Sequence, residues 1–273
     1  MAQNYASKYA SKVDERFKLA SFTDAGLNSD YDFVGVNAVN VYSIETTPLT
    51  NYTMSGDNRY GTPNELNDTV QTLTLSQDKA FTFTVDRRNA DDSAGAKSAG
   101  VALRRQVDEV IIPHIDKYRI STLVAGAGKA TTPATITGDN AYSTFLDAQN
   151  LLSDEGVPAE GRIAYVTPAF FKAIRLDNSF VLASDMGQDM LTKGVVGAID
   201  GVKTVQMPTS YFPEGVSFVI AHKSALVSPV KLAEYKTHDN PPGINGTLVE
   251  GRLYFDAFVL NNKKNSVVVH KEA

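Results

Sequence analysis

The chain has 273 residues, which is enough to bury a full hydrophobic core in one elaborated domain or in two small ones. Its hydrophobic content of 42% and charged content of 21% are ordinary for a soluble protein, and its net charge of −5 argues against a dedicated nucleic-acid-binding protein, which would carry a basic stripe. The absence of cysteine excludes disulfides, zinc–thiolate sites and thiol nucleophiles, and the chain has neither the roughly twenty-residue apolar run of a membrane helix nor a signal-peptide core.

The N-terminal residues 1–32 are predicted to form a polar arm. Tyr9, Val13 and Phe17 recur at intervals of four residues, which suits a short amphipathic helix, but no strong apolar core follows them. An arm that cannot bury its apolar side chains in its own chain either frays or is buried on a partner. Tyr9, Arg16 and Phe17 are therefore candidates for contact with a neighbouring subunit.

Three strands are predicted after the arm. Residues 33–44 are rich in β-branched and aromatic side chains, which favours a strand. Residues 70–75 and 80–86 predict two more, and in the second of these apolar side chains alternate with threonines, as in a strand with one buried face. Residues 76–79 are expected to form the turn between them.

The polar stretch between the first two strands predicts an extended β-hairpin arm over residues 45–90. Loops that exceed about fifteen residues without structure of their own are uncommon in compact domains, and they tend to be functional or mobile. Asp57, Arg59 and Tyr60 lie in this stretch with no local core to hold them. We expect these three residues to contact a neighbouring subunit.

Residues 91–127 predict one long amphipathic helix. Its apolar side chains recur at steps of three or four residues and so share one face. They are Leu103, Val107, Val110, Ile111, Ile115, Tyr118 and Thr122. Charged residues fill the remaining positions, namely Arg104, Arg105, Asp108, Glu109, Asp116 and Lys117. Asp91, Asp92 and Ser93 are N-cap candidates, and Gly126 and Gly128 close the far end.

Pro113 lies inside this predicted helix. A proline cannot donate a hydrogen bond to the carbonyl of Glu109, and its ring crowds that carbonyl, so a kink is expected. The alternative is that one helix stops near Ile112 and a second one follows. The apolar stripe continues in phase to Ile115 and Tyr118, which favours a single kinked helix.

Beyond Gly128 the pattern becomes α/β. The predicted elements are a linker over 130–138, helices over 140–153 and 168–176, a glycine-rich loop and strand over 194–205, strands over 162–166, 216–221, 226–228, 248–260 and 266–270, and a turn-rich loop over 238–246.

A search for catalytic or cofactor motifs finds no convincing site. The segment GAGKAT at 126–131 resembles a phosphate-binding loop, but Leu123 occupies the first glycine position and Ala130 follows the lysine. The four histidines have no metal-ligand spacing, and neither GxSxG nor HExxH occurs. No cofactor or metal is expected. Side chains distant in sequence can still converge, so an enzyme without a linear motif stays open as a second possibility.

An arm, a long polar hairpin and a strut-like helix, without a chemical motif, indicate a protein that works by assembly. The segments that carry this pattern are NYASKYASKVDERFKLAS (4–21), DNRYGTPNELNDTVQTLTLSQDKAFTFTVDRRN (57–89), SAGVALRRQVDEVIIPHIDKYRIS (98–121), GVVGAIDGVKTVQMP (194–208) and LYFDAFVLNNKKNSVVVH (253–270). In this order they resemble the major capsid proteins of tailed bacteriophages with the Hong-Kong-97-like fold, particularly those of phages that infect Gram-positive bacteria.

The resemblance implies an α+β fold with an N-terminal arm over 1–32, a peripheral-domain strand over 33–44, an extended loop over 45–90, a spine helix over 91–127, an axial domain over 128–221, and peripheral strands with the C-terminus over 222–273. It also implies a non-enzymatic subunit that self-assembles through hexamers and pentamers into an icosahedral shell around double-stranded DNA. Such a shell would form in the host bacterial cytoplasm, carry a portal protein and become the virion. Extended loops would lie across adjacent subunits, and arms would reach further ones.

The chain departs from some members of this family in two respects. The arm is too short to hold a cleavable scaffolding segment, so a separate scaffolding protein is expected. Some members crosslink a loop lysine to a C-terminal asparagine, but residues 45–78 contain no lysine, and Lys79 lies beyond the loop tip. Acceptors are available in Asn261, Asn262 and Asn265, but the donor is missing.

Two further classes of protein compete with a phage capsid subunit. An encapsulin-type compartment would share the fold but would enclose cargo enzymes rather than DNA. A surface-binding module would instead show a compact β-sandwich and a signal peptide.

Overall fold

The computed structural model describes residues 21–28, 30–31, 38–44, 46–63, 65–88, 99–177, 179–180 and 197–273. Several predicted features lie outside these residues. They are the arm candidates Tyr9, Arg16 and Phe17, the helix-cap candidates Asp91, Asp92 and Ser93, and the start of the glycine-rich loop at Gly194.

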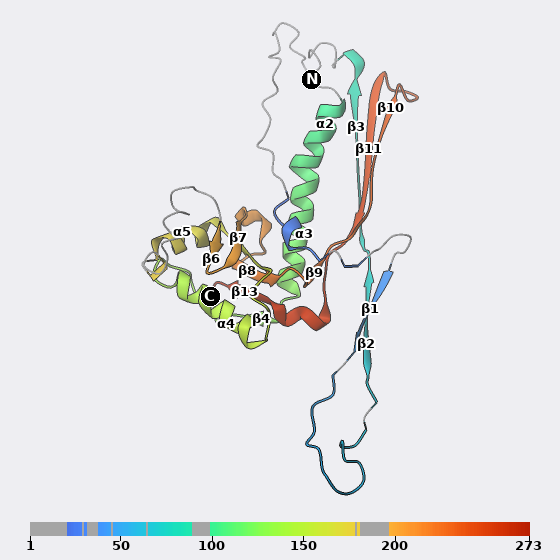
Figure 1. The fold of residues 1–273 in the computed structure, drawn as a ribbon. Coiled ribbons are helices and arrows are strands. Elements are labelled where there is room, and N and C mark those ends of the chain that lie inside the picture. The colour runs from blue at the N-terminus through green and yellow to red at the C-terminus, as the bar shows by residue number, and fades with distance from the viewer. Residues whose placement is uncertain are drawn as a thin grey trace.

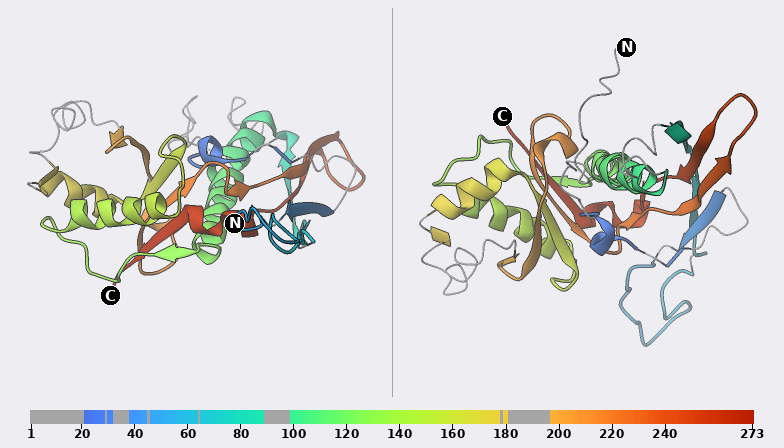
Figure 2. Two further views of the ribbon diagram at one scale, coloured as in Figure 1. Left: turned by 60° about the horizontal axis from the view of Figure 1, so that its bottom comes forward. Right: turned by 90° about the horizontal axis from the view of Figure 1, so that it is seen from above.

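The molecule is α+β and consists of a body from which elongated elements project in two directions (Figure 1). A long helix and a three-stranded ribbon run side by side away from the body, and a two-stranded hairpin with its loop extends the opposite way. The view from above places the body, the helix and the ribbon next to one another in that order (Figure 2).

The body is built on a six-stranded mixed sheet with the order β4-β13-β8-β5-β7-β6. Its strands are β4 (Lys129–Ala130), β5 (Arg162–Val166), β6 (Ala198–Ile199), β7 (Val202–Gln206), β8 (Val216–His222) and β13 (Val267–Lys271). The helices α4 (Ala141–Asp154) and α5 (Pro168–Leu176) belong to the body and pack on the sheet through apolar side chains. The rings of Phe145, Phe170 and Phe218 contact one another at the centre of that core. The predictions of these two helices and of the strands β5, β8 and β13 are confirmed.

The C-terminal strand β13 lies inside the body sheet. It pairs with β8 antiparallel and with β4 parallel, although residues 222–273 are predicted to be peripheral. The buried valines of β13 share the cores of the body, so Val267–Lys271 belong with the 128–221 region. The division into axial and peripheral domains otherwise stays a prediction.

The long helix is continuous from Ala99 to Ala125 but changes its winding midway. It consists of α2 (Ala99–Gln106), a π-helical turn η2 (Val107–Ile111) and α3 (Ile112–Ala125). The amide of Ile112 donates to the carbonyl of Val107, five residues back. This wider turn immediately precedes Pro113, whose missing N–H leaves an interruption in the α-helical bonding. Two separate helices are therefore not observed, and a bend of the axis at Pro113 stays a prediction.

The side chains of the long helix face two cores. Val107, Ile111, Ile115 and Tyr118 pack on the ribbon, as the predicted stripe requires. Ile120 and Leu123 are fully buried against the body instead, and the predicted stripe does not include them. The π turn adds one residue to a turn and so rotates the following side chains by about 100° relative to a regular helix.

The predicted stripe assigns two helix residues to the wrong environment. Val110 is 50% exposed, although the stripe places it on the apolar face. Asp116 is 1% exposed, although its charge predicts a place on the solvated face. A buried carboxylate is tolerated only when its oxygens are hydrogen-bonded, and Asp116 accepts three such bonds.

The ribbon has the order β10-β11-β3 and is formed by β3 (Gln77–Asp86), β10 (Val230–Asp239) and β11 (Gly246–Phe255). The prediction of a turn at 76–79 is wrong, because the chain does not reverse there. Gln77 pairs with Phe255 and Lys79 with Leu253, so β3 already runs along β11. The sequence pattern does not predict the strand β10, because its exposed charged residues obscure the alternation expected of a strand.

The hairpin consists of β1 (Ala38–Ile44) and β2 (Asp68–Thr74), paired antiparallel in one register. The strand β2 leads through two residues into β3, and Figure 1 shows the two nearly in line. The remaining elements are the short strands β9 (Leu226–Val227) and β12 (Phe258–Val259) and the 3-10 turns η1 (Asp24–Gly26), η3 (Thr209–Tyr211) and η4 (Asn261–Ser266).

Candidate inter-subunit surfaces

Exposed apolar side chains are concentrated on the hairpin and its loop. Among the described residues, thirteen large apolar side chains are exposed, and eight of them lie between residues 42 and 70. These are Tyr42, Ile44, Leu49, Tyr52, Met54, Tyr60, Leu66 and Val70. Scattered exposed apolar residues are normal on a protein surface, but a concentration on one projecting element marks an interaction site.

The tip of the loop folds on itself. The amide of Thr53 donates to Arg59 O at 3.0 Å, and the hydroxyl of Thr50 donates to Tyr60 O at 2.9 Å. The rings of Tyr52 and Tyr60 meet edge to face at 5.1 Å. Backbone hydrogen bonds and one aromatic pair therefore organise this segment, although none of residues 46–63 is buried in a local core.

The predicted contact residues Asp57, Arg59 and Tyr60 all lie in this tip, where Arg59 and Tyr60 are the central residues of a turn closed by the hydrogen bond from Gly61 N to Asn58 O at 2.8 Å. Its backbone takes up positive φ angles at Gly56 (91°) and Asn58 (58°), two residue types that tolerate them. The guanidinium Nε of Arg59 donates to Gly56 O at 3.3 Å, and the Tyr60 side chain remains 85% exposed. The tip thus presents an ordered but largely uncovered set of side chains.

The root of the hairpin, by contrast, is buried in the body. Val41, Leu73 and Leu75 form a small core with Val227 and Leu260, and all five are at most 7% exposed. Only one face of β1 and β2 takes part, and Tyr42 and Val70, which are cross-strand partners, lie on the other face.

A buried polar cluster holds residues 21–24 against the long helix. Asp116 accepts hydrogen bonds from Ser21 Oγ at 2.9 Å, Phe22 N at 2.9 Å and Thr23 Oγ1 at 2.5 Å. Arg119, one turn further along, donates to Asp24 Oδ1 at 2.7 Å and to Thr23 Oγ1 at 2.9 Å. The segment that follows the predicted arm is therefore attached to α3 at a defined place.

A second buried carboxylate joins the helix, the hairpin and the ribbon. Asp256 is 3% exposed and accepts hydrogen bonds from Ser76 N, Tyr118 Oη and Ala257 N, each at 2.7 Å. Burial raises the pKa of the Tyr118 hydroxyl, and its hydrogen bond to the Asp256 carboxylate raises it further. Sequence reasoning missed Asp116, Arg119 and Asp256, because a lone charged residue in an apolar pattern resembles a solvated one.

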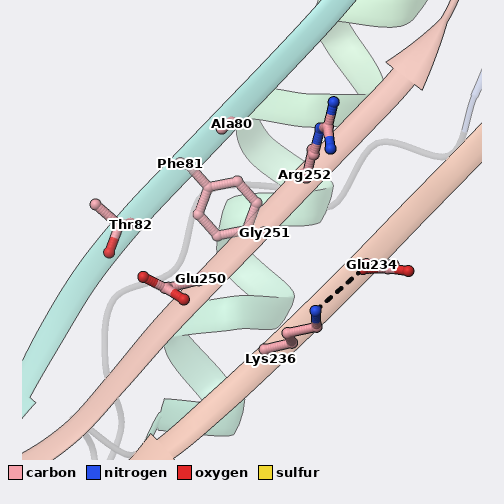
Figure 3. Close-up of a pocket in the computed structure, with 8 residues that line it drawn as sticks. All are labelled: Ala80, Phe81, Thr82, Glu234, Lys236, Glu250, Gly251 and Arg252. Atoms are coloured by element: carbon pink, nitrogen blue, oxygen red, sulfur yellow. Dashed lines mark ion pairs between the residues drawn. The ribbon is translucent and has the colours of Figure 1, made fainter. Parts of the chain in front are cut away.

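The outer face of the ribbon forms a shallow groove of about 500 Å³ (Figure 3). Two of its charged side chains form ion pairs within the ribbon, Arg252 with Asp78 and Lys236 with Glu234, and Glu250 Oε2 lies 3.4 Å from His238 Nε2. The hydrogen bond from Arg252 holds the pKa of the Asp78 carboxyl below its ordinary value.

The ring of Phe81 on the neighbouring strand β3 covers Gly251 in this groove. A Cβ at this position would overlap the ring of Phe81, so the glycine provides the space that Phe81 occupies. The lysine and the arginine that line the groove are already paired within the ribbon. It therefore offers less for a partner than the hairpin does.

Asn265, one of the predicted crosslink acceptors, is engaged within its own chain. Its amide donates to Glu155 Oε2 at 2.8 Å, and Lys129 Nζ lies 2.5 Å from Glu155 Oε1. Both hydrogen bonds lower the pKa of the Glu155 carboxyl, and the one from Lys129 has the larger effect. The three residues tie the end of α4 to the start of β4 and to η4.

Among the described residues there is no group of three or more histidine, aspartate or glutamate side chains that could hold a metal ion. In the same part of the chain, none of the helices combines the length and the apolar character required to cross a membrane.

Comparison with known proteins gives matches in structure only. No protein-family model matches the chain, and no curated protein matches it. A structure from Mycobacterium phage Che8 is similar with a TM-score of 0.80 and 19% identity, over 99% of this chain and 98% of that one. The structure titled "Capsid structure of the Cyanophage P-SCSP1u" has a TM-score of 0.77 and 11% identity, over 99% and 93% of the two chains. The asymmetric unit of the bacteriophage PhiM1 mature capsid has a TM-score of 0.76 and 12% identity, over 98% and 91%.

The chain therefore has the Hong-Kong-97-like fold of tailed-phage capsid proteins, as the resemblance in sequence implied. Identities of 11–19% establish this similarity at the level of the fold.

Proposed function

We propose that this chain is the major capsid protein of a tailed bacteriophage, which self-assembles through hexamers and pentamers into an icosahedral shell around double-stranded DNA. The fold supports the proposal, because similar structures described as capsids align over more than nine-tenths of their own length. The role is structural rather than enzymatic.

The single observation that carries the proposal is the apolar surface of the hairpin. Eight large apolar side chains project into solvent from one extended element whose root, but not its outer part, is covered by the body. Contact between apolar surface and water is unfavourable, and a second chain that covers this surface removes that cost. Identical subunits related by closed symmetry provide such cover for every copy at once.

In the proposed shell, Asp57, Arg59 and Tyr60 contact an adjacent subunit, and Tyr9, Arg16 and Phe17 of the arm contact a further one. Residues 128–221, joined by β13, form the axial domain around hexamer and pentamer centres. The partners are other copies of the chain, a separate scaffolding protein and a portal protein. The net charge of −5 fits DNA that is enclosed by proximity rather than bound by a basic stripe. The shell forms in the host bacterial cytoplasm and becomes the virion.

Backbone hydrogen exchange tests this proposal. Amides of residues 50–66 exchange fast in the free subunit and slowly in assembled particles, because a neighbour covers the loop only in the shell. Amides of α4, whose apolar face is buried in the body in either state, serve as the internal control. Equal protection of 50–66 in both states contradicts the assigned contact.

Electron microscopy and light scattering of the purified protein, alone and with its natural scaffold, test the assembly itself. Pentamers, hexamers or closed shells are the expected products. A chain that stays monomeric at high concentration and with scaffold is not a capsid subunit.

A further inference from the structure

We infer that the direction of the hairpin β1–β2 is fixed in the free subunit, before any neighbour is present, by contacts at its root. We define the hairpin root as Val41, Gln71, Leu73, Leu75 and Ser76. The inference rests on the proposed function for its biological purpose, but the physical statement concerns one isolated chain.

Gln71 makes the most specific of these contacts. Its Nε2 donates to Val259 O at 3.2 Å, and its Oε1 accepts from Asn261 N at 2.8 Å. Both ends of one side-chain amide therefore bind backbone groups on either side of Leu260, a residue with no exposed surface. These two bonds to separate backbone groups restrict β2 from rotating or sliding relative to the body.

The apolar part of the root lies beside this amide. Val41 and Leu73 are 7% and 1% exposed, and they belong to one buried cluster with Val227 and Leu260. Burial ends at Gln71, because the next residues toward the loop, Thr69 and Val70, are exposed. The hairpin is thus seated on the body along its last few residues and projects freely beyond them.

The strand that leaves the hairpin is held at two consecutive residues. Leu75 O accepts a hydrogen bond from Tyr254 Oη at 3.1 Å, and Ser76 N donates to Asp256 Oδ2 at 2.7 Å. Gln77 then enters the ribbon opposite Phe255. No flexible connection separates the root from the ribbon, so the direction of β2 follows that of β3 (Figure 1).

A direction fixed in advance lowers the cost of assembly. Ordering a flexible element at an interface costs conformational entropy and so reduces the net affinity. An element that is already ordered by folding loses that entropy before association. The root contacts are then positioning contacts for the exposed surface of the hairpin. The loop tip can still adapt, since, among the described residues, its hydrogen bonds join it to other residues of the same loop.

Distance measurements between two spin labels test this inference in the free subunit. The chain has no cysteine, so Asp68→Cys at the far end of β2 and Lys172→Cys on α5 give two unique sites, both exposed. Labelled protein diluted with unlabelled protein keeps the measured distance within one chain. One narrow distance distribution is expected.

Gln71→Ala removes both amide contacts and is expected to broaden the distribution. Gln71 is only half-buried, so this variant is expected to fold. Thr72→Ala is the matched control, because the Thr72 hydroxyl donates to Asn40 Oδ1 inside the hairpin and not to the body. Tyr254→Phe, which removes the bond to Leu75 O, is a second variant and is expected to broaden it as well.

A broad distribution in the unmodified subunit overturns the inference, as does an unchanged distribution in both Gln71→Ala and Tyr254→Phe. The result does not depend on whether shells form. If the distribution is narrow but the protein never assembles, the inference of a fixed hairpin direction holds and the proposed function is contradicted.

Discussion

The hydroxyl of Tyr118 donates a hydrogen bond of 2.7 Å to Asp256 Oδ1, and through it the long helix is joined to the end of β11. The neighbouring Arg119 reaches the same carboxylate residue indirectly, because its Nε donates to Ser228 Oγ, which in turn donates to Asp256 O. Asp116, on the preceding turn, holds residues 21–23. Residues 116–119 of α3 therefore hold the segment 21–24 directly. Through Asp256 they are also joined to Ser76, which follows β2, and to the end of β11.

Replacement of Tyr118 by Phe should lower the free energy of unfolding by about 1.5–3 kcal/mol at pH 7, since the lost hydrogen bond ends on a buried carboxylate. Chemical denaturation measures this difference. The pKa of the Tyr118 hydroxyl is raised in the folded protein, so it makes stability depend on alkaline pH. Its contribution is complete below the ordinary pKa of 10.0 and is lost as the pH rises through the higher folded-state pKa. Tyr118→Phe lacks this component of the alkaline loss. Tyr60→Phe, on the exposed loop tip, is the control and should leave stability unchanged.

Replacement of Asp116 by Ala should cost at least about 1–3 kcal/mol of stability, because it leaves three donors without their acceptor, whereas Arg119 keeps its ion pair with Asp24. The amides of residues 22–28 should exchange faster than those of the body. Asp147→Ala on the exposed side of α4 should change stability by less than about 0.5 kcal/mol. Comparable effects of both substitutions would mean that the cluster does not hold residues 21–24.

Replacement of Pro113 by Ala restores an N–H that can bond to Glu109 O, which favours a straighter helix by up to roughly 3 kcal/mol in isolation. We expect the π turn at Val107–Ile111 to tighten toward an α-helix, with the thermal stability of the free subunit unchanged or raised. In the proposed shell the curvature of this helix sets the angle between neighbours. Electron microscopy should therefore show aberrant particles or altered shell sizes. Shells of normal size and yield would show that Pro113 is only a tolerated irregularity.

The contact between Glu155 and Lys129 should make stability depend on pH in the acid range. The pKa of Glu155 is lowered from its ordinary value of 4.5, so its contribution is complete above that pH and is lost as the pH falls through the folded-state value. Glu155→Gln should be less stable than the unmodified protein at pH 7, and the difference should shrink below pH 4.5. Denaturation curves at several pH values measure this. A difference that stays constant with pH would rule out the charge as its cause.

No covalent network between subunits is expected in mature particles. Residues 45–78 contain no lysine to act as donor, and the side-chain amide of the acceptor candidate Asn265 donates a hydrogen bond to Glu155 in its own chain. Denaturing gels of particles should therefore show one band at the chain mass of 29.5 kDa. A ladder of higher oligomers would disprove this prediction.

The sequence alone determined the elements whose signals are local. The helix Ala141–Asp154, the strand Arg162–Val166 and the helix that opens with Pro168 lie where periodicity and proline placement predicted them. Each depends on side chains within one or two turns, so a single segment carries the complete pattern. The order of such segments also carried the resemblance to phage capsid proteins, and the shared fold confirms that resemblance at the structural level.

Only the tertiary structure decided features whose causes are distant in sequence. Residues 76–79 have the composition of a turn, but Ser76 N bonds to Asp256, 180 residues away, and the chain continues into β3. Asp116 has the character of a surface residue, but donors from residues 21–23 allow its burial. The strand β13 lies in the body sheet because it pairs with β8 and with β4, which come from distant parts of the sequence. Propensity and pattern describe what a segment can do alone, whereas pairing and hydrogen bonding depend on partners that only the folded chain brings together.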